Sequence, residues 1–415
     1  MAAGSDARGA AFETLTLVGG GRQFESALDE AAAGLDDTDR RLAYEIAAGV
    51  LRSRTELDSR LAPLVSGSWE HTPDGTKDLL RIGAYQLLKL SRVPSYAAVQ
   101  TTVEAAKRSG GRKSAGLVNA VLRRLSRTAD QREPEGDLAA RYSHPEWLVE
   151  RWLAHYGDVR TEALLGHNNR RPPLVIQPVR STLEALGVAL SEAGVPHSPA
   201  AFGAGFVTES GKVQQLPGYR DGAFVVQDPV QVRLLEFAAI PDGARVWDAC
   251  AAPGGKAAVL AGRCKVVASE LRRDRLERLG DTLARTAPDV PVLLADAARP
   301  PLRPGATDVV LVDAPCSATG TMARHPDARW RLSADQIERA ARWQAAILDG
   351  VAPVVGPGAL LLYMTCSLEP EENERQVNGF LERHPEFERE GDDLSIFPPD
   401  EGTDGGYAAR MRRTR

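Results

Sequence analysis

The feature that most constrains the fold is an alternation of short apolar segments and longer amphipathic ones, which begins near residue 240. The apolar segments read ARVWDAC, KVVASE, PVLLAD, TDVVLVDAP and ALLLYMTC. Short, almost entirely apolar strands are typical of a parallel sheet that helices cover on both faces. The intervening segments, around 256–263, 271–286, 333–352 and 370–383, have the length and pattern of helices. Residues 236–415 are therefore predicted to form a doubly wound α/β domain.

A carboxylate or a thiol stands at, or just past, the end of each predicted strand. In open α/β sheets, ligands bind in the crevice beyond the carboxyl ends of the strands. A helix cap explains one such acid, but a polar residue after five strands in succession indicates a site. The residues are Asp248, Glu270, Asp296, Asp313, Cys316 and Cys366.

The turn DACAAPGGKAA, residues 248–258, favours a nucleoside ligand without phosphates. Its two adjacent glycines allow a backbone to come close to a ligand at a helix N-terminus. A phosphate-binding P-loop would have glycine at 250 and serine or threonine after Lys256, where this chain has Cys250 and Ala257. A dinucleotide motif would read GxGxxG, and Pro253 removes an amide that a pyrophosphate would use.

Two further acids agree with a nucleoside. Glu270 lies 22 residues after Asp248, at the end of the second predicted strand, where an acid can hold ribose hydroxyls. Asp296 ends the third predicted strand and is suitably placed for the edge of an adenine. S-adenosylmethionine meets all of these conditions, so we expect it as the cofactor.

Cys316, in LVDAPCSATGT, and Cys366, in LLYMTCSLEPEENE, follow neighbouring predicted strands. Methylation of carbon 5 of cytosine requires a thiolate that adds to carbon 6, a carboxyl near N3 and a base that removes the carbon 5 proton. Asp313, three residues before Cys316, supplies a carboxyl. A cation such as Lys256 would lower the pKa of a nearby thiol. The pattern therefore predicts a two-thiol catalytic site.

The other two of the four cysteines, Cys250 and Cys264, are interpreted as small buried apolar residues. There is no CxxC motif, and the seven histidines are scattered, so neither a metal site nor a disulfide framework is expected. The N-terminus lacks the apolar core of a signal peptide, and no run of about 18 apolar residues is present. We expect a cytoplasmic monomer that does not associate with membranes.

The first part of the chain has a different pattern. Residues 1–130 place apolar side chains at three- and four-residue spacing, which predicts an all-α domain. Residues 128–137, TADQREPEGD, are polar and indicate a linker. Residues 138–235 begin with an amphipathic helix and continue as short strands around one helix, which predicts a small α+β module that helps to bind RNA.

Positive charge concentrates between residues 101 and 127, although the net charge of the chain is −5. This stretch contains seven basic residues and a single acidic residue, Glu104. A local basic face can bind phosphates on an acidic protein, although a solvated helix face explains an isolated run of charge equally well. The basic residues are Lys107, Arg108, Arg112, Lys113, Arg123, Arg124 and Arg127.

Two sets of motifs resemble known families. DRRLAYEIAAGVLR, LRIGAYQLLKL, VPSYAAVQTTVEAAK and GLVNAVLRRL resemble the NusB-like domain, whose basic helical face contacts RNA. DACAAPGGK, ASE, LAD, VVLVDAPCSATGT and YMTCSLEPEENE resemble, in order and spacing, the Nol1/Nop2/Sun RNA cytosine-5 methyltransferases. The combination is similar to the bacterial Sun/Fmu branch, which methylates one cytosine of 16S rRNA, and implies a Rossmann-like methyltransferase domain.

The resemblance also implies roles for individual residues. Cys366 would be the nucleophile, Cys316 would assist product release and Asp313 would meet the N3 edge of the cytosine. The chain has Ala318 where the family usually has glycine, and Met364 before the TCS triplet, but neither is a reacting group. The residues implied in binding the cofactor are Asp248, Cys250, Ala251, Ala252, Pro253, Gly254, Gly255, Lys256, Glu270, Asp296 and Asp313.

We therefore expect an S-adenosylmethionine-dependent enzyme that methylates carbon 5 of a cytosine in the RNA of the small ribosomal subunit. A tRNA cytosine-5 methyltransferase and a non-catalytic NusB-like RNA-binding factor remain the alternatives. A swap of the two cysteine roles also stays open. The expected RNA contacts are Arg112, Lys113, Arg123 and Arg124 in the helical domain, and Arg324, His325, Asp327 and Arg329 in the loop MARHPDARWR.

Overall fold

The structure is a computed structural model that describes residues 6–128, 136–208 and 213–415. The chain forms two compact units. The first comprises Met1–Arg171 together with Met322–Arg331, and the second comprises Pro172–Thr321 and Leu332–Arg415. Among the helices in the described part of the chain, none has both the length and the apolar character needed to cross a membrane.

The first unit is helical in its described residues, as the apolar spacing predicts. Its third helix shows why: Asp36 caps the N-terminus by accepting hydrogen bonds from the amides of Thr38 and Asp39, and the face that carries Ile46 and Val50 is buried. The helices are α1 (Ala7–Gly19), α2 (Phe24–Ala31), α3 (Asp37–Arg52), α4 (Arg54–Leu61), α5 (Asp74–Lys89), α6 (Ser95–Thr128), α7 (Leu138–Tyr142), α8 (Glu146–Asn168) and α13 (Ala328–Arg331).

The division into units differs from the predicted domain boundaries in two places. Helices α7 and α8 belong to the helical unit, whereas the sequence grouped residues from 138 onward with the small α+β module. The segment Met322–Arg331 also belongs to the helical unit, although it lies within the predicted methyltransferase domain. Most of the predicted linker, residues 129–135, lies outside the described residues.

The second unit begins with the small α+β module. Its antiparallel sheet has the strand order β2-β3-β1-β4, with β1 (Leu174–Pro178), β2 (His197–Pro199), β3 (Phe206–Thr208) and β4 (Phe224–Val226), and it carries helix α9 (Leu183–Glu192). The guanidinium of Arg285, on the next domain, donates to the carbonyls of Tyr219 and Phe224 at 3.1 and 2.9 Å. The module and the large α/β domain are therefore joined by polar contacts inside one unit.

The large sheet has the strand order β10-β12-β9-β8-β5-β6-β7, with β11 paired to β12. The strands predicted from the sequence, β5 (Arg245–Asp248), β6 (Lys265–Glu270), β7 (Val292–Leu294), β8 (Thr307–Asp313) and β9 (Val355–Thr365), are parallel. Three strands that the sequence analysis did not predict, β10 (Phe387–Arg389), β11 (Leu394–Ile396) and β12 (Gly406–Arg413), make it a mixed sheet because β12 runs antiparallel to β9.

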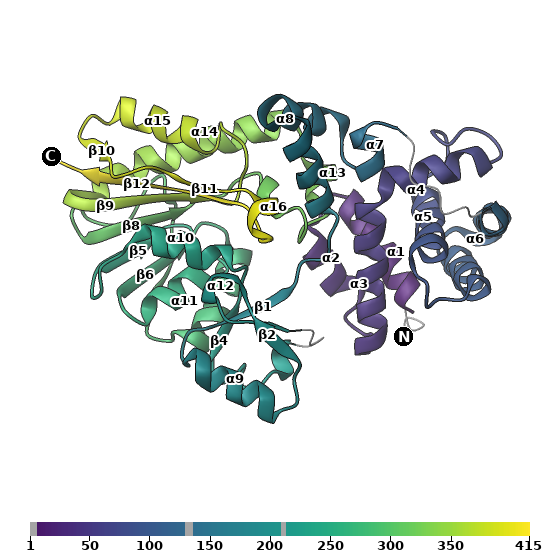
Figure 1. The fold of residues 1–415 in the computed structure, drawn as a ribbon, viewed down its shortest axis with the longest axis horizontal. Coiled ribbons are helices and arrows are strands. Elements are labelled where there is room, and N and C mark those ends of the chain that lie inside the picture. The colour runs from purple at the N-terminus through teal and green to yellow at the C-terminus, as the bar shows by residue number, and fades with distance from the viewer. Residues whose placement is uncertain (1–5, 129–135, 209–212) are drawn as a thin grey trace. The chain divides into compact units, whose positions relative to one another are not determined.

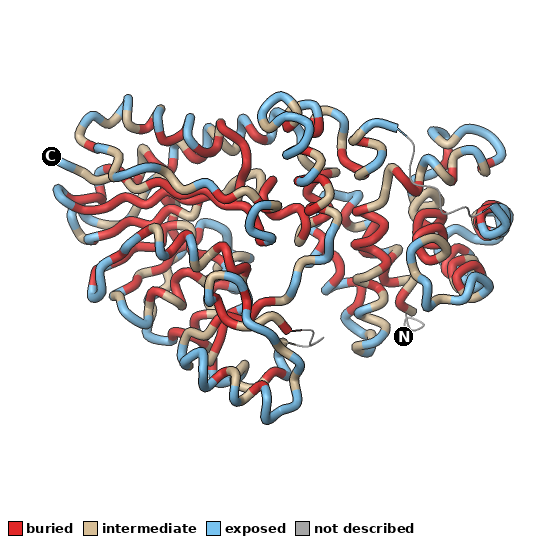
Figure 2. The backbone as a smooth tube through the Cα atoms, viewed as in Figure 1, coloured by how far each residue is buried: buried red, intermediate tan, exposed pale blue. Residues whose placement is uncertain are grey.

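Both faces of the large sheet are buried. Along β8, Val310 and Val312 point to one face, where α14 (Ala334–Val351) and α15 (Glu374–Arg383) pack, and Leu311 points to the other. The second face is covered by α10 (Val230–Ala238), α11 (Gly255–Ala261) and α12 (Arg273–Thr286). Figure 1 shows these two helical layers, and Figure 2 shows the sheet strands largely buried between them.

Candidate active site

The order of the strands places a crevice beside β5. The chain continues from β5 to β6 and β7 on one side, and β8 then lies on the other side of β5. Ligands bind at such a switch point, beyond the carboxyl ends of the strands. Asp248 ends β5, Asp313 ends β8 and Cys366 directly follows β9, so the predicted residues meet at this edge.

The two cysteines lie against each other. The Sγ atoms of Cys316 and Cys366 are 3.3 Å apart, and both side chains are half-buried. The hydrogen bond with Cys366, together with burial, raises the pKa of the Cys316 thiol well above its ordinary value. Either thiol can be the donor in this contact, so the geometry brings the two thiols together without distinguishing their roles.

The loop after β8 has a conformation that favours glycine. Ala318 has φ 57°, in the left-handed region, where a side chain beyond hydrogen is disfavoured. Glycine adopts this conformation without strain, which is consistent with glycine being the usual residue of the family at this position. The loop is also fixed by Gly320, whose amide donates to the carbonyl of Cys366 at 2.9 Å.

Lys256 forms an ion pair with Asp313, which lies three residues before Cys316 in the sequence. The Nζ atom of Lys256 lies 2.6 Å from Oδ2 of Asp313, and the lysine side chain is 9% exposed against 33% for the aspartate. The sequence suggested that Lys256 ionises a cysteine, but the contact that the structure shows is with the carboxylate. The pair therefore places a charged, hydrogen-bonding group at the carboxyl end of β8.

Asp248 is a buried carboxylate without a hydrogen-bond partner. Its side chain is 0% exposed, and neither carboxylate oxygen is bonded. Burial raises the pKa of Asp248 to about 7, and the charge of Asp313 adds to the rise. A buried carboxylate of this kind is stabilised by a cation, and the α-ammonium group of S-adenosylmethionine would supply one.

A cavity lies beside the residues that follow β5, at the ends of β6 and β7. Glu270 accepts hydrogen bonds from the amides of Leu271 and Arg272 with one oxygen, while its other oxygen is buried and lies 3.4 Å from Nε of Arg275, which also lines the cavity. Asp296 lies across the cavity, and an apolar rim not recognised in the sequence completes it. The lining residues include Ala249, Cys250, Glu270, Leu271, Asp296, Pro315, Trp343 and Ile347. Acceptors between apolar walls fit a nucleoside.

The glycine turn between β5 and α11 lies beside this cavity. Gly254 has φ 108° immediately before α11. At Gly255, a Cβ would lie 2.3 Å from Oε1 of Gln227, so a larger residue would require the Gln227 side chain to move. Ala251 and Ala252 are buried, and a cis peptide joins Ala252 to Pro253. The predicted turn, residues 248–258, therefore places its backbone next to the cavity residues Ala249 and Cys250.

Comparisons with known proteins agree with this geometry. Residues 237–412 match the family described as 16S rRNA methyltransferase RsmB/F, residues 5–127 match the NusB family, and residues 144–208 match the RsmF/B-like ferredoxin-like domain. The chain is 35% identical over 409 residues to ribosomal RNA small subunit methyltransferase B of Erwinia tasmaniensis, with 94% of each chain covered. The same enzyme of Vibrio cholerae is 34% identical, with 95% of this chain and 94% of the relative covered.

The chain belongs to the RsmB/F family of 16S rRNA methyltransferases. The crystal structure of PH0851 has the same fold, with a TM-score of 0.84 and 23% identity, and 99% of each chain is covered. A methyltransferase homologue from Pyrococcus horikoshii shares the fold of part of the chain, with a TM-score of 0.57, 22% identity, and coverage of 67% of this chain and 98% of the other.

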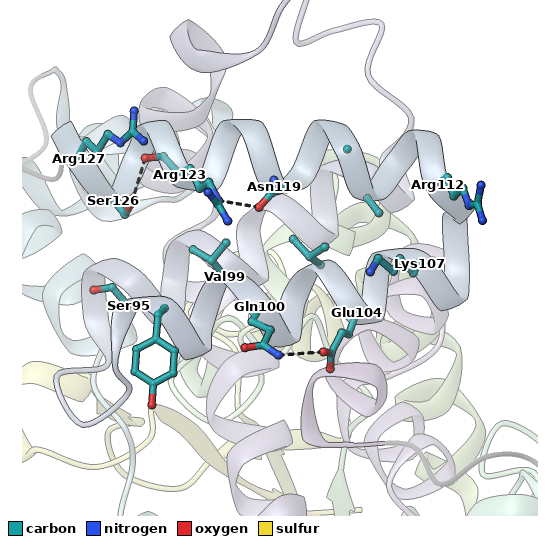
Figure 3. A pocket seen from close by; sticks show the side chains of 14 residues that line it. Ser95, Val99, Gln100, Glu104, Lys107, Arg112, Asn119, Arg123, Ser126 and Arg127 are labelled. Carbon is teal, nitrogen blue, oxygen red and sulfur yellow. Dashed lines mark hydrogen bonds between the residues drawn. The ribbon is translucent and has the colours of Figure 1, made fainter.

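In this RsmB/F family member, helix α6 carries the predicted RNA contacts of the helical unit. Gly111, with φ 71°, divides α6 into two arms. An open groove of about 870 Å³ runs between them, and Arg112 and Arg123 line it (Figure 3). Lys113 and Arg124 are also exposed, as RNA contacts must be, although Arg124 donates to the carbonyl of Leu64 at 3.2 Å.

The loop MARHPDARWR contradicts part of the prediction. Arg329 is 0% exposed and donates to the side chain of Asn169 at 2.7 Å and to the carbonyl of Asn168 at 2.8 Å. Asp327 is also buried and accepts a hydrogen bond from the amide of Phe24 at 3.2 Å. The prediction that these two residues face RNA is therefore wrong, because they join the loop to the helical unit.

The other two residues of this loop are more accessible. Arg324 is half-buried, and the His325 side chain is 39% exposed, with its Nδ1 atom 3.9 Å from Glu25. Both stay predicted RNA contacts.

Proposed function

We propose that the protein methylates carbon 5 of a cytosine in 16S rRNA, with S-adenosylmethionine as methyl donor and a covalent bond between Cys366 and the base. The observation that carries the proposal is the pair of thiols 3.3 Å apart at the carboxyl ends of the central strands. The Lys256–Asp313 pair lies at the same edge. This set supplies the thiolate, the carboxyl and the second thiol that cytosine methylation requires.

The chemistry follows from the order of bond changes. The Cys366 thiolate adds to carbon 6 of the cytosine, while Asp313, acting as an acid, donates a proton to N3 and so neutralises the negative charge that develops on the ring. When bound, S-adenosylmethionine supplies an electrophilic methyl group to the activated carbon 5. A base then takes the carbon 5 proton, and the electrons of that carbon–hydrogen bond restore the double bond between carbons 5 and 6. Cys366 leaves carbon 6 as a thiolate, N3 returns its proton to Asp313, and Cys316 assists this elimination.

The roles proposed for the two thiols follow the family resemblance of their motifs. Cys366, in the TCS triplet, is the proposed nucleophile, and Cys316, beside the DAP turn, is the proposed helper. The contact of 3.3 Å between the two Sγ atoms is compatible with either assignment, because either thiol can be the donor. A swap of the two roles is therefore the alternative that cysteine variants must test.

The cavity residues are proposed to hold S-adenosylmethionine. Asp248, whose carboxylate oxygens have no hydrogen-bond partner, receives the α-ammonium group, and Glu270 receives the ribose hydroxyls. Asp296 lies across the cavity for the adenine edge. The turn from Cys250 to Lys256 borders the methionine portion. Flipping of the target base out of its RNA stack would bring it to the thiols.

Replacing Glu270 with alanine should weaken cofactor binding without affecting thiol chemistry. The change removes acceptors for ribose hydroxyls, and hydrogen bonds to charged groups contribute roughly 1.5–3 kcal/mol. Calorimetry should therefore show S-adenosylmethionine affinity reduced by about ten- to a hundredfold. Glu277→Ala, at an exposed position of α12 outside the cavity lining, is the control. Wild-type affinity in Glu270→Ala would place the ribose elsewhere.

Ribosomal RNA is the proposed substrate because the relatives named above act on the RNA of the small subunit. A cytoplasmic enzyme acting as a monomer is consistent with this proposal. Bisulfite sequencing of total RNA should reveal one 16S rRNA cytosine that loses methylation when the gene is deleted. The wild-type gene should restore the mark and Cys366→Ala should not. Loss at a tRNA cytosine, with rRNA unchanged, would contradict the proposed substrate.

Charge reversal of Arg112, Lys113, Arg123 and Arg124 should weaken RNA binding. These exposed residues would contact phosphates, so the logarithm of affinity should also depend less steeply on the logarithm of salt concentration. Four lost contacts predict a slope smaller by up to about three to four. Affinity for S-adenosylmethionine should stay unchanged. An unaltered salt slope would show that this basic face is only solvated.

A further inference from the structure

Each active-site cysteine is followed by a serine, and both serines bind the same carboxylate. Ser317 follows Cys316 and Ser367 follows Cys366. The hydroxyls of the two serines both donate to Oε2 of Glu372. One side chain from the segment after β9 therefore connects the loops that carry the two thiols.

The other carboxylate oxygen strengthens this connection. Oε1 of Glu372 accepts a hydrogen bond from the amide of Ser317 at 2.8 Å and another from Nε2 of Gln344 at 3.0 Å. Gln344 also donates to the carbonyl of Pro315, the residue before Cys316, at 3.0 Å. The hydrogen bonds thus reach the backbone on one side of Cys316 and both the backbone and side chain on the other.

Because the Glu372 side chain is buried, its carboxylate depends on these hydrogen bonds. Glu372 is 0% exposed, and burial raises the pKa of its carboxyl group. Burial of a carboxylate is costly unless donors surround it, and a shift of either loop would remove donors from Glu372. The main chain of Glu372 is fixed as well, because the hydroxyl of Tyr363 on β9 donates to its carbonyl at 2.7 Å. Because the backbone of Glu372 is itself held by β9, its carboxylate fixes the distance between the loop that carries Cys316 and the loop that carries Cys366.

The loops also have contacts that do not involve this carboxylate. The amide of Gly320 donates to the carbonyl of Cys366 at 2.9 Å, and the amide of Leu368 donates to Oγ1 of Thr319 at 2.9 Å. Loss of the Glu372 side chain should therefore loosen the alignment of the thiols while the fold persists.

We infer that Glu372 is a positioning residue that fixes the Cys316 and Cys366 thiols against each other through Ser317 and Ser367. The contribution of Glu372 to catalysis rests on the proposed function, in which both thiols take part in the reaction. The placement of the thiols, however, can be measured on the RNA-free protein, and that measurement does not depend on the reaction.

Disulfide formation measures this placement directly. A diazene oxidant takes two protons and two electrons from the thiols, is reduced to a hydrazine, and leaves a bond between Cys316 and Cys366. Glu372→Ala should slow this bond formation at least tenfold, and Glu372→Gln, which keeps one acceptor oxygen, should have a smaller effect. Peptide mapping after alkylation identifies the bonded pair. Glu374→Gln removes a carboxylate from an exposed neighbour and should form the disulfide at the wild-type rate.

General destabilisation needs its own control. Val377→Ala shortens a side chain of α15 that is 0% exposed in the core, and it leaves the Glu372 contacts intact. Glu372→Ala should form the disulfide more slowly than Val377→Ala even where the two melt at the same temperature. Equal rates in these two variants, or a wild-type rate in Glu372→Ala, would overturn the inference.

Activity then separates this inference from the proposed function. For Glu372→Ala we expect kcat for RNA methylation to fall about a hundredfold, with KM for RNA and affinity for S-adenosylmethionine near wild type. A fall in affinity instead of kcat would also overturn the inference. A wild-type protein that makes no 5-methylcytosine would refute the proposed function alone, since the disulfide rates would still report on Glu372.

Discussion

Cys366→Ala is expected to abolish both methyl transfer and any covalent adduct, whereas Cys316→Ala should leave the enzyme joined to its RNA. Cys366 is proposed to form the bond to carbon 6, so nothing can begin without it. Cys316 is proposed to act after methyl transfer, so its loss allows attack and then stops elimination. The 3.3 Å separation of the two Sγ atoms places both groups at one reacting ring.

Denaturing gels with labelled RNA distinguish these outcomes. A slowly migrating band should appear with Cys316→Ala and S-adenosylmethionine, and it should be absent with Cys366→Ala and with the double variant. Cys264→Ala, which alters the thiol in the turn before β6, should behave as wild type. A trapped band with Cys366→Ala instead would reverse the two roles. No trapped band with either variant would contradict the covalent mechanism.

Asp248 should make cofactor binding depend on pH. Its pKa is raised to about 7, chiefly by burial, and only the ionised carboxylate can pair with the α-ammonium group. Affinity for S-adenosylmethionine should therefore rise with pH up to about 7 and fall by roughly tenfold for each unit below it. Calorimetry between pH 5.5 and about 7.5 avoids titration of the α-amino group itself. Asp248→Asn should bind weakly, with no such slope.

The ligand-free protein gives an independent readout of the same group. Because the pKa of Asp248 in the folded state lies above the ordinary aspartate value of 3.8, the folded state binds more protons than the unfolded state between about pH 4 and 7. This contribution to the free energy of unfolding should therefore fall as pH rises through that window. Asp248→Asn should remove it, and Asp242→Asn, at a side chain 82% exposed, should not. An unchanged pH dependence of stability in Asp248→Asn would show that the carboxylate is not strained by burial.

The central part of the fold could be predicted because its pattern is local. Strands β5 to β9 are short apolar runs, and each is followed by the polar residue that enters the crevice. The pairing of Cys316 with Cys366 was expected for the same reason, since loops after adjacent parallel strands meet at one edge. Strands β10 and β11 have only three residues each, too few for an alternating pattern to identify them.

The residues that sequence reasoning missed depend on partners far along the chain. The loop MARHPDARWR is rich in charge and was expected to face RNA, yet Arg329 is buried against residues about 160 positions earlier. Nothing in the ten residues of the loop encodes those partners. Glu372 was likewise read only as part of the motif EPEENE, because its serine contacts come from a separate loop. The exposed acid of that motif, Glu374, looks the same in the sequence.

Met322–Arg331 belongs to the helical unit, although the residues before and after it belong to the second unit. This affects how the protein can be divided into fragments. A fragment that starts at Pro172 would contain the whole catalytic sheet but would lose Asn168 and Asn169. Arg329 would then keep its guanidinium without the acceptors that it has in the intact chain. The ten residues begin immediately after Thr321, so the active-site loop itself would lead into an unsupported segment. We therefore expect a fragment cut at Pro172 to be less stable than the same residues in the intact chain, because this segment would lose its acceptors.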